Sequence, residues 1–339
     1  MNAIDLTTPK ELGEVVEAAA SVSTFCQFDA GQVFTGTASG NLIPGFTQAG
    51  PRVPAVNPCF VWPDWALYLF AWYTHDRSPL YITGSTGTGK TESVRQLAAL
   101  INMPVYEVNG HARLESPELF GHYVLRGQET VWLDGPLTAA ARNGGILLIN
   151  EIDLLDPSTA TGLNTVLDGA PLQIVETGEL VPVHPAFVFV ATANTAGSGD
   201  NTGLYQGTLA MNAAFMDRFV VFQADYLDPA TEQGILHKSY PNLPEDIAGK
   251  MVKVAGMVRT IVDGKSLGSD LDTQLSGVTF NVPLSTRSLL KWAKYIQIFA
   301  PFAQMGKAPV LEASRVAYST RLDMPARLAF EEILQRVFG

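Results

Sequence analysis

The sequence Gly84-Ser85-Thr86-Gly87-Thr88-Gly89-Lys90-Thr91 decides how the rest of the chain is interpreted. It matches the phosphate-loop pattern G-x-x-x-x-G-K-[ST] at every fixed position. Glycines let backbone N–H groups converge on a phosphate, and the start of the following helix adds a partial positive charge. We therefore expect this loop to bind a nucleotide, with Lys90 reaching the β- and γ-phosphates and the Thr91 hydroxyl binding Mg²⁺.

The residues on either side of the loop supply the context that such a loop requires. A short apolar strand, Leu80-Tyr81-Ile82-Thr83, precedes it, and residues 92–101 after it have a helical pattern. A plain glycine-rich turn gives no reason for a lysine and a threonine at the last two positions. A dinucleotide-binding loop is excluded, because Glu92 stands where G-x-G-x-x-G needs its last glycine.

Short apolar runs alternate with helical stretches through the middle of the chain. The predicted strands are residues 80–83, 105–108, 145–149 and 186–191. This alternation is typical of a parallel sheet covered by helices on both faces, so the predicted fold class is α/β. Two further segments read as β-hairpins inserted into that core, residues 123–133 and 172–183.

The first two regions of the chain differ in composition. Residues 1–58 are predicted to be an N-terminal arm or small accessory region, helical at 11–22 but rich in Gly and Pro, without a regular element, at 30–58. Residues 59–228 are predicted to be the α/β nucleotide-binding domain, beginning with a buried aromatic-rich helix at 61–71. Residues 60–62 within that segment could border the base of a nucleotide.

The last third of the chain is predicted to be a helical lid domain, residues 229–339. Its predicted helices are residues 229–240, 244–262, 285–300 and 324–338. Between the second and third of them, residues 263–283 are rich in Gly, Ser and Asp and are expected to form an exposed loop or hairpin.

Composition and charge limit the function classes. The chain has 339 residues, 47% of them hydrophobic and 16% charged, with a formal net charge of -11. An acidic chain is a poor partner for nucleic acid, which attracts clustered Lys and Arg. No apolar run reaches the ~18 residues that span a bilayer, and no apolar leader begins the chain, so we expect neither membrane insertion nor export. Cys26 and Cys59 are expected to be reduced thiols in a cytoplasmic protein.

A second group of candidate residues follows the predicted strand at 145–149. Glu151 is the candidate catalytic base, but Asn150 stands where a nucleotide triphosphatase usually has an aspartate. An amide accepts a hydrogen bond from a metal-bound water and brings no negative charge. Either the chain is a working variant, in which Thr91 and the phosphates hold Mg²⁺, or it binds ATP as a scaffold with little turnover. We favour the working variant, because the remaining catalytic positions are present.

Three further residues complete the candidate site. Asn194 follows the strand at 186–191 and could orient the attacking water, although it could also cap a turn. Arg218 ends a predicted helix, where it could reach the γ-phosphate of a neighbouring subunit or form only a surface ion pair. Arg287 opens a helix of the predicted lid and could touch the phosphates from that side.

Taken together, these motifs resemble the MoxR-related AAA+ ATPases, and most closely the ATPase subunit of aerobic cobaltochelatase, the CobS type. The likeness runs from about residue 34 to the C-terminus and is weakest at residues 1–30 and 263–283. The segments that carry it are Arg52-Val53-Pro54, His184-Pro185-Ala186-Phe187, Ala191-Thr192-Ala193-Asn194-Thr195, Gly197-Ser198-Gly199-Asp200, Thr202-Gly203-Leu204-Tyr205, Asp217-Arg218-Phe219, Ser285-Thr286-Arg287 and Gln335-Arg336-Val337-Phe338-Gly339.

The resemblance implies a role for each candidate residue. Residues 84–91 would be the Walker A loop, and Asn150 with Glu151 would stand at Walker B, where the family has Asp-Glu. Asn194 would be sensor 1, Arg218 the arginine finger and Arg287 sensor 2.

The resemblance also implies an assembly and a task. The family forms rings, most often hexamers, with ATP bound between subunits, and its two inserted hairpins match those predicted above. Its members remodel or activate a protein partner, usually one with a metal-binding von Willebrand factor A domain. A nucleic-acid motor of related fold is the less favoured alternative.

Overall fold

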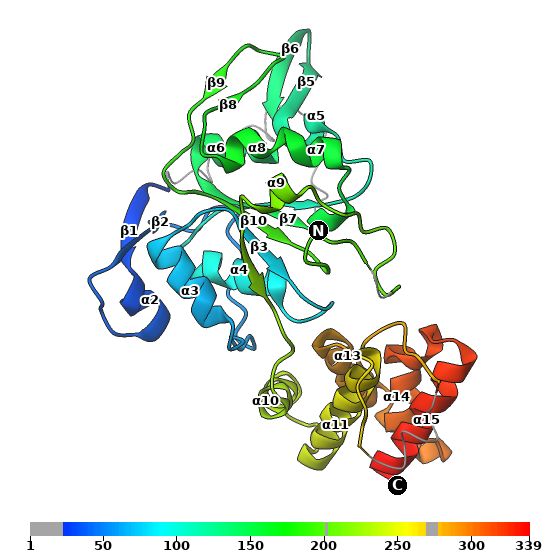
Figure 1. Ribbon diagram of the computed structural model, residues 1–339. Helices are drawn as coiled ribbons and strands as arrows, with labels where there is room; N and C mark the ends of the chain where they lie inside the picture. The colour runs from blue at the N-terminus through cyan, green and yellow to red at the C-terminus, as the bar shows by residue number, and fades with distance from the viewer. Residues whose placement is uncertain (1–22, 201–202, 269–276) are drawn as a thin grey trace, which may run out of the picture.

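The computed structural model describes residues 23–200, 203–268 and 277–339. At its centre is a parallel sheet of five strands in the order β11-β3-β10-β7-β4 (Figure 1). The strands are β3 (Leu80–Thr83), β4 (Val105–Asn109), β7 (Gly145–Asn150), β10 (Phe187–Thr192) and β11 (Val220–Gln223). The four predicted strands and the α/β fold class are confirmed, and β11 is an additional strand that the sequence pattern did not indicate.

Helices cover both faces of the sheet, because successive side chains of a strand point to opposite faces. Leu80 and Ile82 pack with α3 and α4 on one face, whereas Tyr81 packs with α6 to α9 on the other. All six residues of β7 are buried, as expected of a central strand covered twice. The helices of this part are α3 (Ala66–His75), α4 (Lys90–Leu100), α5 (Ser116–Phe120), α6 (Pro136–Asn143), α7 (Pro157–Gly162), α8 (Asn164–Leu167) and α9 (Ala213–Met216), with a 3-10 turn at Ile152–Leu154.

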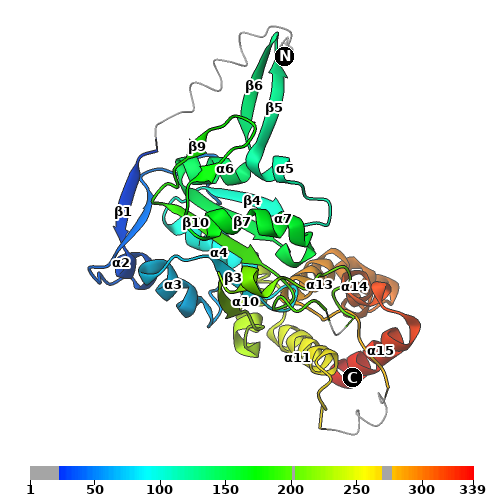
Figure 2. The same cartoon turned by 45° about the horizontal axis from the view of Figure 1, so that its top comes forward.

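Both predicted hairpins are present. β5 (Gly121–Arg126) pairs with β6 (Glu129–Asp134), and β8 (Leu172–Gln173) pairs with β9 (Leu180–Val181). The first is inserted between α5 and α6 and projects well beyond the rest of the fold (Figure 2).

The N-terminal region differs from its prediction. The predicted helix at 11–22 lies outside the described residues, and residues 30–58 are not irregular throughout, as the Gly and Pro content had suggested. They contain α2 (Ala30–Thr35) and β2 (Leu42–Phe46), which pairs with β1 (Phe25–Asp29). The reason is Asp29, whose carboxylate accepts hydrogen bonds from the backbone of Gln32, Ser39 and Gly40 and so caps α2 and closes the following loop.

The aromatic-rich helix also differs in its bounds and burial. α3 begins at Ala66, after Pro63, rather than at residue 61. Leu67 and Tyr68 are 71% and 66% exposed, whereas Leu69 and Tyr73 are fully buried. Only one face of α3 packs on the sheet. The many apolar residues in this segment therefore led the sequence prediction to overestimate how much of the helix is buried.

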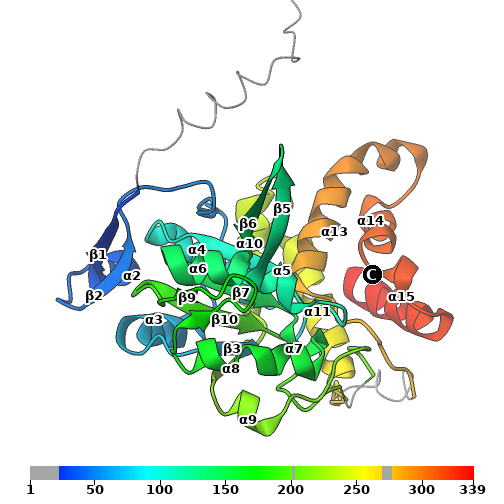
Figure 3. The ribbon, with the colours of Figure 1, turned by 90° about the horizontal axis from the view of Figure 1, so that it is seen from above.

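The C-terminal third is helical (Figure 3). Its helices pack on one another around Trp292 and Phe330. The helices are α10 (Pro229–Ser239), α11 (Glu245–Val262), α13 (Thr286–Ile298), α14 (Pro309–Ala317) and α15 (Met324–Phe338), with 3-10 turns at Ala300–Met305 and Ser319–Arg321. The four predicted helices are confirmed, and α14 was not predicted. Its start signal is Pro309 at the first helical position.

The loop predicted at 263–283 is described only at its two ends, and neither end contains a strand. The prediction of an exposed segment is wrong at Phe280, which is 2% exposed and packs into the helical core. The large apolar ring of Phe280 favours burial, although the residues around it in the sequence are mostly polar. Within the described residues, no helix is both long and apolar enough to cross a membrane.

Candidate active site

The loop between β3 and α4 has a backbone that requires glycine. Gly87 and Gly89 have φ angles of 84° and 87°, in the left-handed region. A Cβ atom at Gly87 would also overlap the side chain of Ser285, which caps the start of α13. The loop therefore lies directly against the first turn of a C-terminal helix, with no room for a side chain between them.

Lys90 is the first residue of α4, and its ammonium group is buried in this loop. Nζ donates hydrogen bonds to the carbonyl oxygens of Gly84 and Ser85 at 2.5 and 3.0 Å, and lies 3.4 Å from Asn194 Oδ1. Burial lowers the pKa of Lys90 to about 8, whereas the charges of Asp153 and Glu151 act to raise it. No carboxylate among the described residues forms a salt bridge with it. A desolvated cation with neutral partners is a strong site for an anion.

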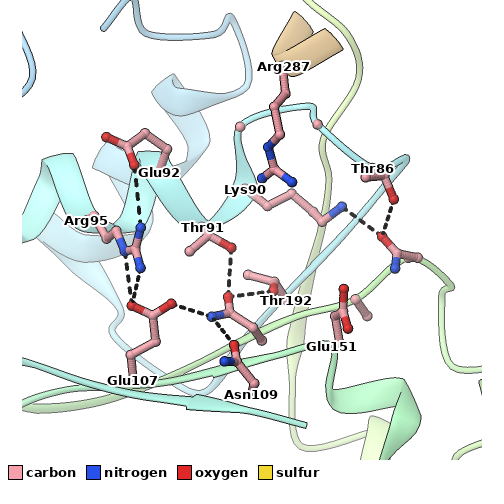
Figure 4. Close-up of a pocket in the computed structure, with 15 residues that line it drawn as sticks. Thr86, Lys90, Thr91, Glu92, Arg95, Glu107, Asn109, Glu151, Thr192 and Arg287 are labelled. Carbon is pink, nitrogen blue, oxygen red and sulfur yellow. Dashed lines mark hydrogen bonds and ion pairs between the residues drawn. The ribbon is translucent and has the colours of Figure 1, made fainter. Parts of the chain in front are cut away.

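Asn150, at the end of β7, joins three elements through its side-chain amide, on which the dashed lines from Thr91, Thr192, Glu107 and Asn109 in Figure 4 converge. Its Oδ1 accepts hydrogen bonds from the hydroxyls of Thr91 at 2.7 Å and Thr192 at 3.2 Å. Its Nδ2 donates to Glu107 Oε1 at 2.6 Å and to Asn109 Oδ1 at 3.3 Å. The amide therefore links α4, β10 and β4.

Sequence reasoning missed Glu107, Asn109 and Thr192. A signal for the first two exists, because Glu107 and Asn109 stand at alternate positions near the end of β4 and so point to the same face. The register that pairs Asn109 with Asn150 brings that face to the candidate site.

Glu151 follows β7 with a left-handed backbone, φ 54° and ψ 45°. For a residue with a side chain this conformation costs about 1 kcal/mol or more, and such strain gathers at functional sites. The turn directs the carboxylate into the cavity, on the side of Lys90 (Figure 4).

Asn194 follows β10 and faces the loop. Its Oδ1 lies 3.4 Å from both Thr86 Oγ1 and Lys90 Nζ. The backbone here is fixed by Asp153, a fully buried carboxylate whose Oδ2 accepts from the N–H of Asn194 and from the N–H and hydroxyl of Thr195. Sequence reasoning assigned Asp153 no role, because 41 residues separate it from Asn194.

Arg218 is the predicted catalytic residue that the structure does not bring to the cavity; of the predicted loop, Gly84, Ser85 and Thr88 also lie outside its lining. Arg218 is absent from the described residues that line the cavity. Its guanidinium instead binds Asp168 at 2.7 and 3.1 Å and the carbonyl oxygen of Ala214 at 2.6 Å. This is the surface ion pair that the sequence left open as an alternative, and it is also compatible with a role in a neighbouring subunit.

Arg287, near the start of α13, lines the cavity from the lid side. The neighbouring Thr286 hydroxyl donates to Glu232, a buried carboxylate that also binds Arg259 at 2.8 and 2.9 Å. The Arg259 guanidinium lies 3.9 Å from the ring centre of Tyr226. The Tyr226 hydroxyl in turn donates to the carbonyl of Thr86 at 3.0 Å. A chain of contacts thus runs from the phosphate loop to the C-terminal helices.

The cavity fits a magnesium–nucleotide complex. It has a volume of about 340 Å³ and is lined by the loop, Lys90, Arg287 and the oxygen-bearing side chains of Thr91, Asn150, Glu107 and Glu151. Hydroxyl, amide and carboxylate oxygens are the ligands that Mg²⁺ prefers.

An apolar cavity of about 270 Å³ adjoins the first one and shares Gly87, Gly89 and Arg287 with it. Phe60, Val61, Ile235 and Leu290 line it, which suits the flat face of a base. The role suggested for residues 60–62 stays a prediction. Among the described residues that line this cavity Trp62 is absent, and its ring packs on Phe60 and Phe70.

Replacing Asp153 by alanine is expected to lower the free energy of unfolding by about 3 kcal/mol, because it leaves buried donors at residues 194 and 195 without an acceptor. Urea unfolding of the free protein measures this. The control is Asp156→Ala, which removes an exposed carboxylate that caps α7 and should cost about 1 kcal/mol. Equal losses for the two variants would contradict the structural role of Asp153.

Two known families match consecutive parts of the chain. The AAA domain of the dynein-related subfamily matches residues 79–219, and the CbbQ/NirQ/NorQ C-terminal family matches residues 232–322. The first match covers the sheet apart from β11, together with the site residues up to Arg218, and the second covers most of the C-terminal helices.

Individual relatives extend these matches over most of the chain. The aerobic cobaltochelatase subunit CobS of Sinorhizobium sp is 30% identical over 308 residues, 88% of this chain and 86% of that protein. Protein NorQ of Paracoccus denitrificans is 33% identical over 213 residues, 62% of this chain and 74% of that protein. The denitrification regulatory protein NirQ of Stutzerimonas stutzeri is 33% identical over 224 residues, 65% of this chain and 77% of that protein. The likeness inferred from the motifs is thus confirmed, and the chain belongs to the MoxR-type AAA+ ATPases, close to CobS.

Proposed function

We propose that the chain hydrolyses Mg-ATP as a ring and uses the reaction to remodel or activate a protein partner. The observation that supports this most directly is the convergence of Lys90, Glu151 and Asn194 on one cavity. A buried cation, a carboxylate and an amide are the groups that hydrolysis of a phosphoanhydride needs in one place. All three residues lie in the nucleotide-binding domain that we propose at 59–228, and Arg287 approaches the cavity from the lid that we propose at 229–339.

Each residue then has a specific task. Lys90 and the N–H groups of the loop bind the phosphates, and the desolvation of Lys90 strengthens that attraction. Glu151 accepts a proton from the attacking water and orients it. Asn194 holds the same water from the side of β10. Arg287 adds positive charge from the lid.

Thr91 and Asn150 are the residues we assign to Mg²⁺, Thr91 through its hydroxyl and Asn150 through a water molecule. When bound, the ion supplies positive charge that neutralises the phosphate oxygens. The two side chains are already held together by the 2.7 Å hydrogen bond between them.

The assembly we propose is a homo-oligomeric ring, most simply a hexamer. Arg218 lies away from the cavity of its own subunit, so a contribution to hydrolysis requires a neighbour. In a ring, part of the surface of each subunit becomes interface, which agrees with a chain that is only 16% charged.

The partner we propose is a protein with a von Willebrand factor A-type domain, in the cytoplasm, as the family resemblance implies. The name of the relative CobS points to a cobalt chelatase, whereas that of NirQ, a denitrification regulatory protein, points to another system. Nucleic acid stays a disfavoured partner, because the net charge is -11.

A nucleotide-dependent scaffold with weak turnover is the second candidate. The observation in its favour is Asn150, which brings no charge and engages the Thr91 hydroxyl directly. The two candidates differ in the rate of phosphate release and agree on nucleotide binding.

Glu151→Gln is expected to lower the rate of ATP hydrolysis by about 10²- to 10⁴-fold, because the amide cannot accept the proton of water. Nucleotide binding should persist. Phosphate release and equilibrium binding measure the two effects. Glu129→Gln, on the remote hairpin strand β6, is the matched control and should keep the wild-type rate. If wild type releases phosphate no faster than Glu151→Gln, the result contradicts hydrolysis and favours the nucleotide-dependent scaffold.

Affinity for ATP is expected to fall as the pH rises above 8. Burial lowers the pKa of Lys90 in the free protein to about 8, so the ammonium that attracts phosphate is lost above that pH. The phosphates lose their last proton near pH 6 and stay ionised throughout this window. The expected loss is about tenfold per pH unit between pH 8 and 10.

Titration of an unhydrolysable ATP analogue in EDTA, at several pH values, measures this slope. Lys90→Arg is the control, because a guanidinium stays charged to above about pH 12. It should bind more weakly at pH 7 but without the slope. The same slope in both proteins would show that Lys90 is not its source.

Mixing two variants tests the position of Arg218. Arg218→Ala is expected to lower the rate by about 10³-fold, and Glu151→Gln is also nearly inactive. In a mixed ring, an intact Arg218 from one subunit meets an intact Glu151 from its neighbour, so activity should exceed the sum of the two parts. A mixture no more active than that sum would place Arg218 outside the neighbouring site.

A further inference from the structure

Asn150 and Glu107 form a hydrogen bond that fixes the orientation of both side chains. The Glu107 carboxylate only accepts hydrogen bonds, so it must face the NH₂ end of the amide, 2.6 Å away. The oxygen end of Asn150 then faces the hydroxyls of Thr91 and Thr192, which can donate. Each end of the amide meets a group of the opposite kind.

An aspartate at residue 150 would not fit this arrangement. One of its oxygens would face the Glu107 carboxylate at hydrogen-bond distance, and two carboxylates that close cannot both stay ionised. Asn150 and Glu107 are therefore a matched pair. The negative charge that an aspartate would have placed at the end of β7 is present instead on the neighbouring strand β4.

The charge of Glu107 is only partly offset by its other neighbour, Arg95. Arg95 binds the second carboxylate oxygen, Oε2, at 2.6 and 3.0 Å. Arg95 also lies 3.8 Å from Glu92, so one cation serves two carboxylates and the three groups carry a net charge of -1. These contacts hold one oxygen of Glu107 and leave the other against Asn150, within the cavity (Figure 4).

We propose that Glu107 supplies the magnesium site with the negative charge that Asn150 lacks, and that the two residues act as one unit. This rests on the proposed function, since it concerns the same Mg-ATP site. Glu107 is a positioning residue. It acts by orienting the Asn150 amide and through the electrostatic field of its own carboxylate. The chain thereby keeps a carboxylate at its magnesium site although the Walker B position holds an amide.

Nucleotide binding with and without Mg²⁺ tests the proposal. Wild type should bind an unhydrolysable ATP analogue more tightly with Mg²⁺ than in EDTA. Glu107→Gln should reduce this gain about 10- to 100-fold, the usual cost of removing a residue that supports a metal ligand. Its affinity in EDTA should match that of wild type. The double variant, Glu107→Gln with Asn150→Asp, moves the carboxylate from residue 107 to residue 150. It should recover most of the increase in affinity that Mg²⁺ causes in wild type.

Glu129→Gln is the matched control for charge. Glu129 lies on strand β6 and is absent from the described residues that line the cavity, so its replacement should leave the gain from Mg²⁺ intact. Thermal unfolding of the free protein gives a second readout. Asn150→Asp alone should lower the melting temperature through carboxylate repulsion, and adding Glu107→Gln should restore it.

Two results would overturn the proposal: a full Mg²⁺ gain in Glu107→Gln, or a loss of affinity that is equally large in EDTA and so reflects a structural role alone. Failure of the proposed function looks different. In that case wild type itself would not bind the ATP analogue, with or without Mg²⁺.

Discussion

The burial of one lysine constrains most of what surrounds it. A desolvated ammonium is stable only if its three protons find acceptors, and Lys90 finds them in the carbonyl oxygens of Gly84 and Ser85 and in Asn194 Oδ1. A loop that turns its carbonyls inward at that point needs left-handed residues nearby, which Gly87 and Gly89 provide. The carboxylates of Asp153 and Glu151 add favourable charge from the turn that follows β7. The glycine pattern of the loop and the nearby acids are thus both matched to a single buried charge.

Local signals predicted most of the fold and part of the site. Strands β3, β4, β7 and β10, both hairpins and four C-terminal helices follow from periodicity and turn residues. The sequence did not reveal interactions between residues far apart in the chain. Asp29 organises α2 through hydrogen bonds with residues up to 11 positions away, and Asp153 holds a loop 41 residues later. Arg218 and Asp168 meet across 50 residues. Such pairs depend on tertiary structure and leave no local pattern.

The departure at Asn150 looks different once its neighbours are known. Considered alone, an amide in place of an aspartate suggests a weakened site. In the structure the amide sits between two hydroxyls that donate to it and a carboxylate that accepts from it. The polar amide of Asn150 on β7 is thus matched by the charged carboxylate of Glu107 on β4. The two side chains can meet because β4 and β7 are neighbours in parallel register. The relevant unit is the pair of strand ends rather than the single motif position.

The contact between Tyr226 and the phosphate loop has a mechanical consequence. Tyr226 holds the carbonyl of Thr86 with its hydroxyl and carries Arg259 on its ring. Arg259 is fixed by the buried Glu232, and breaking such a pair by removing one partner costs about 3–5 kcal/mol. The tyrosine therefore couples the loop to helices α10 and α11 through a continuous set of side-chain contacts, which does not depend on the covalent linker alone.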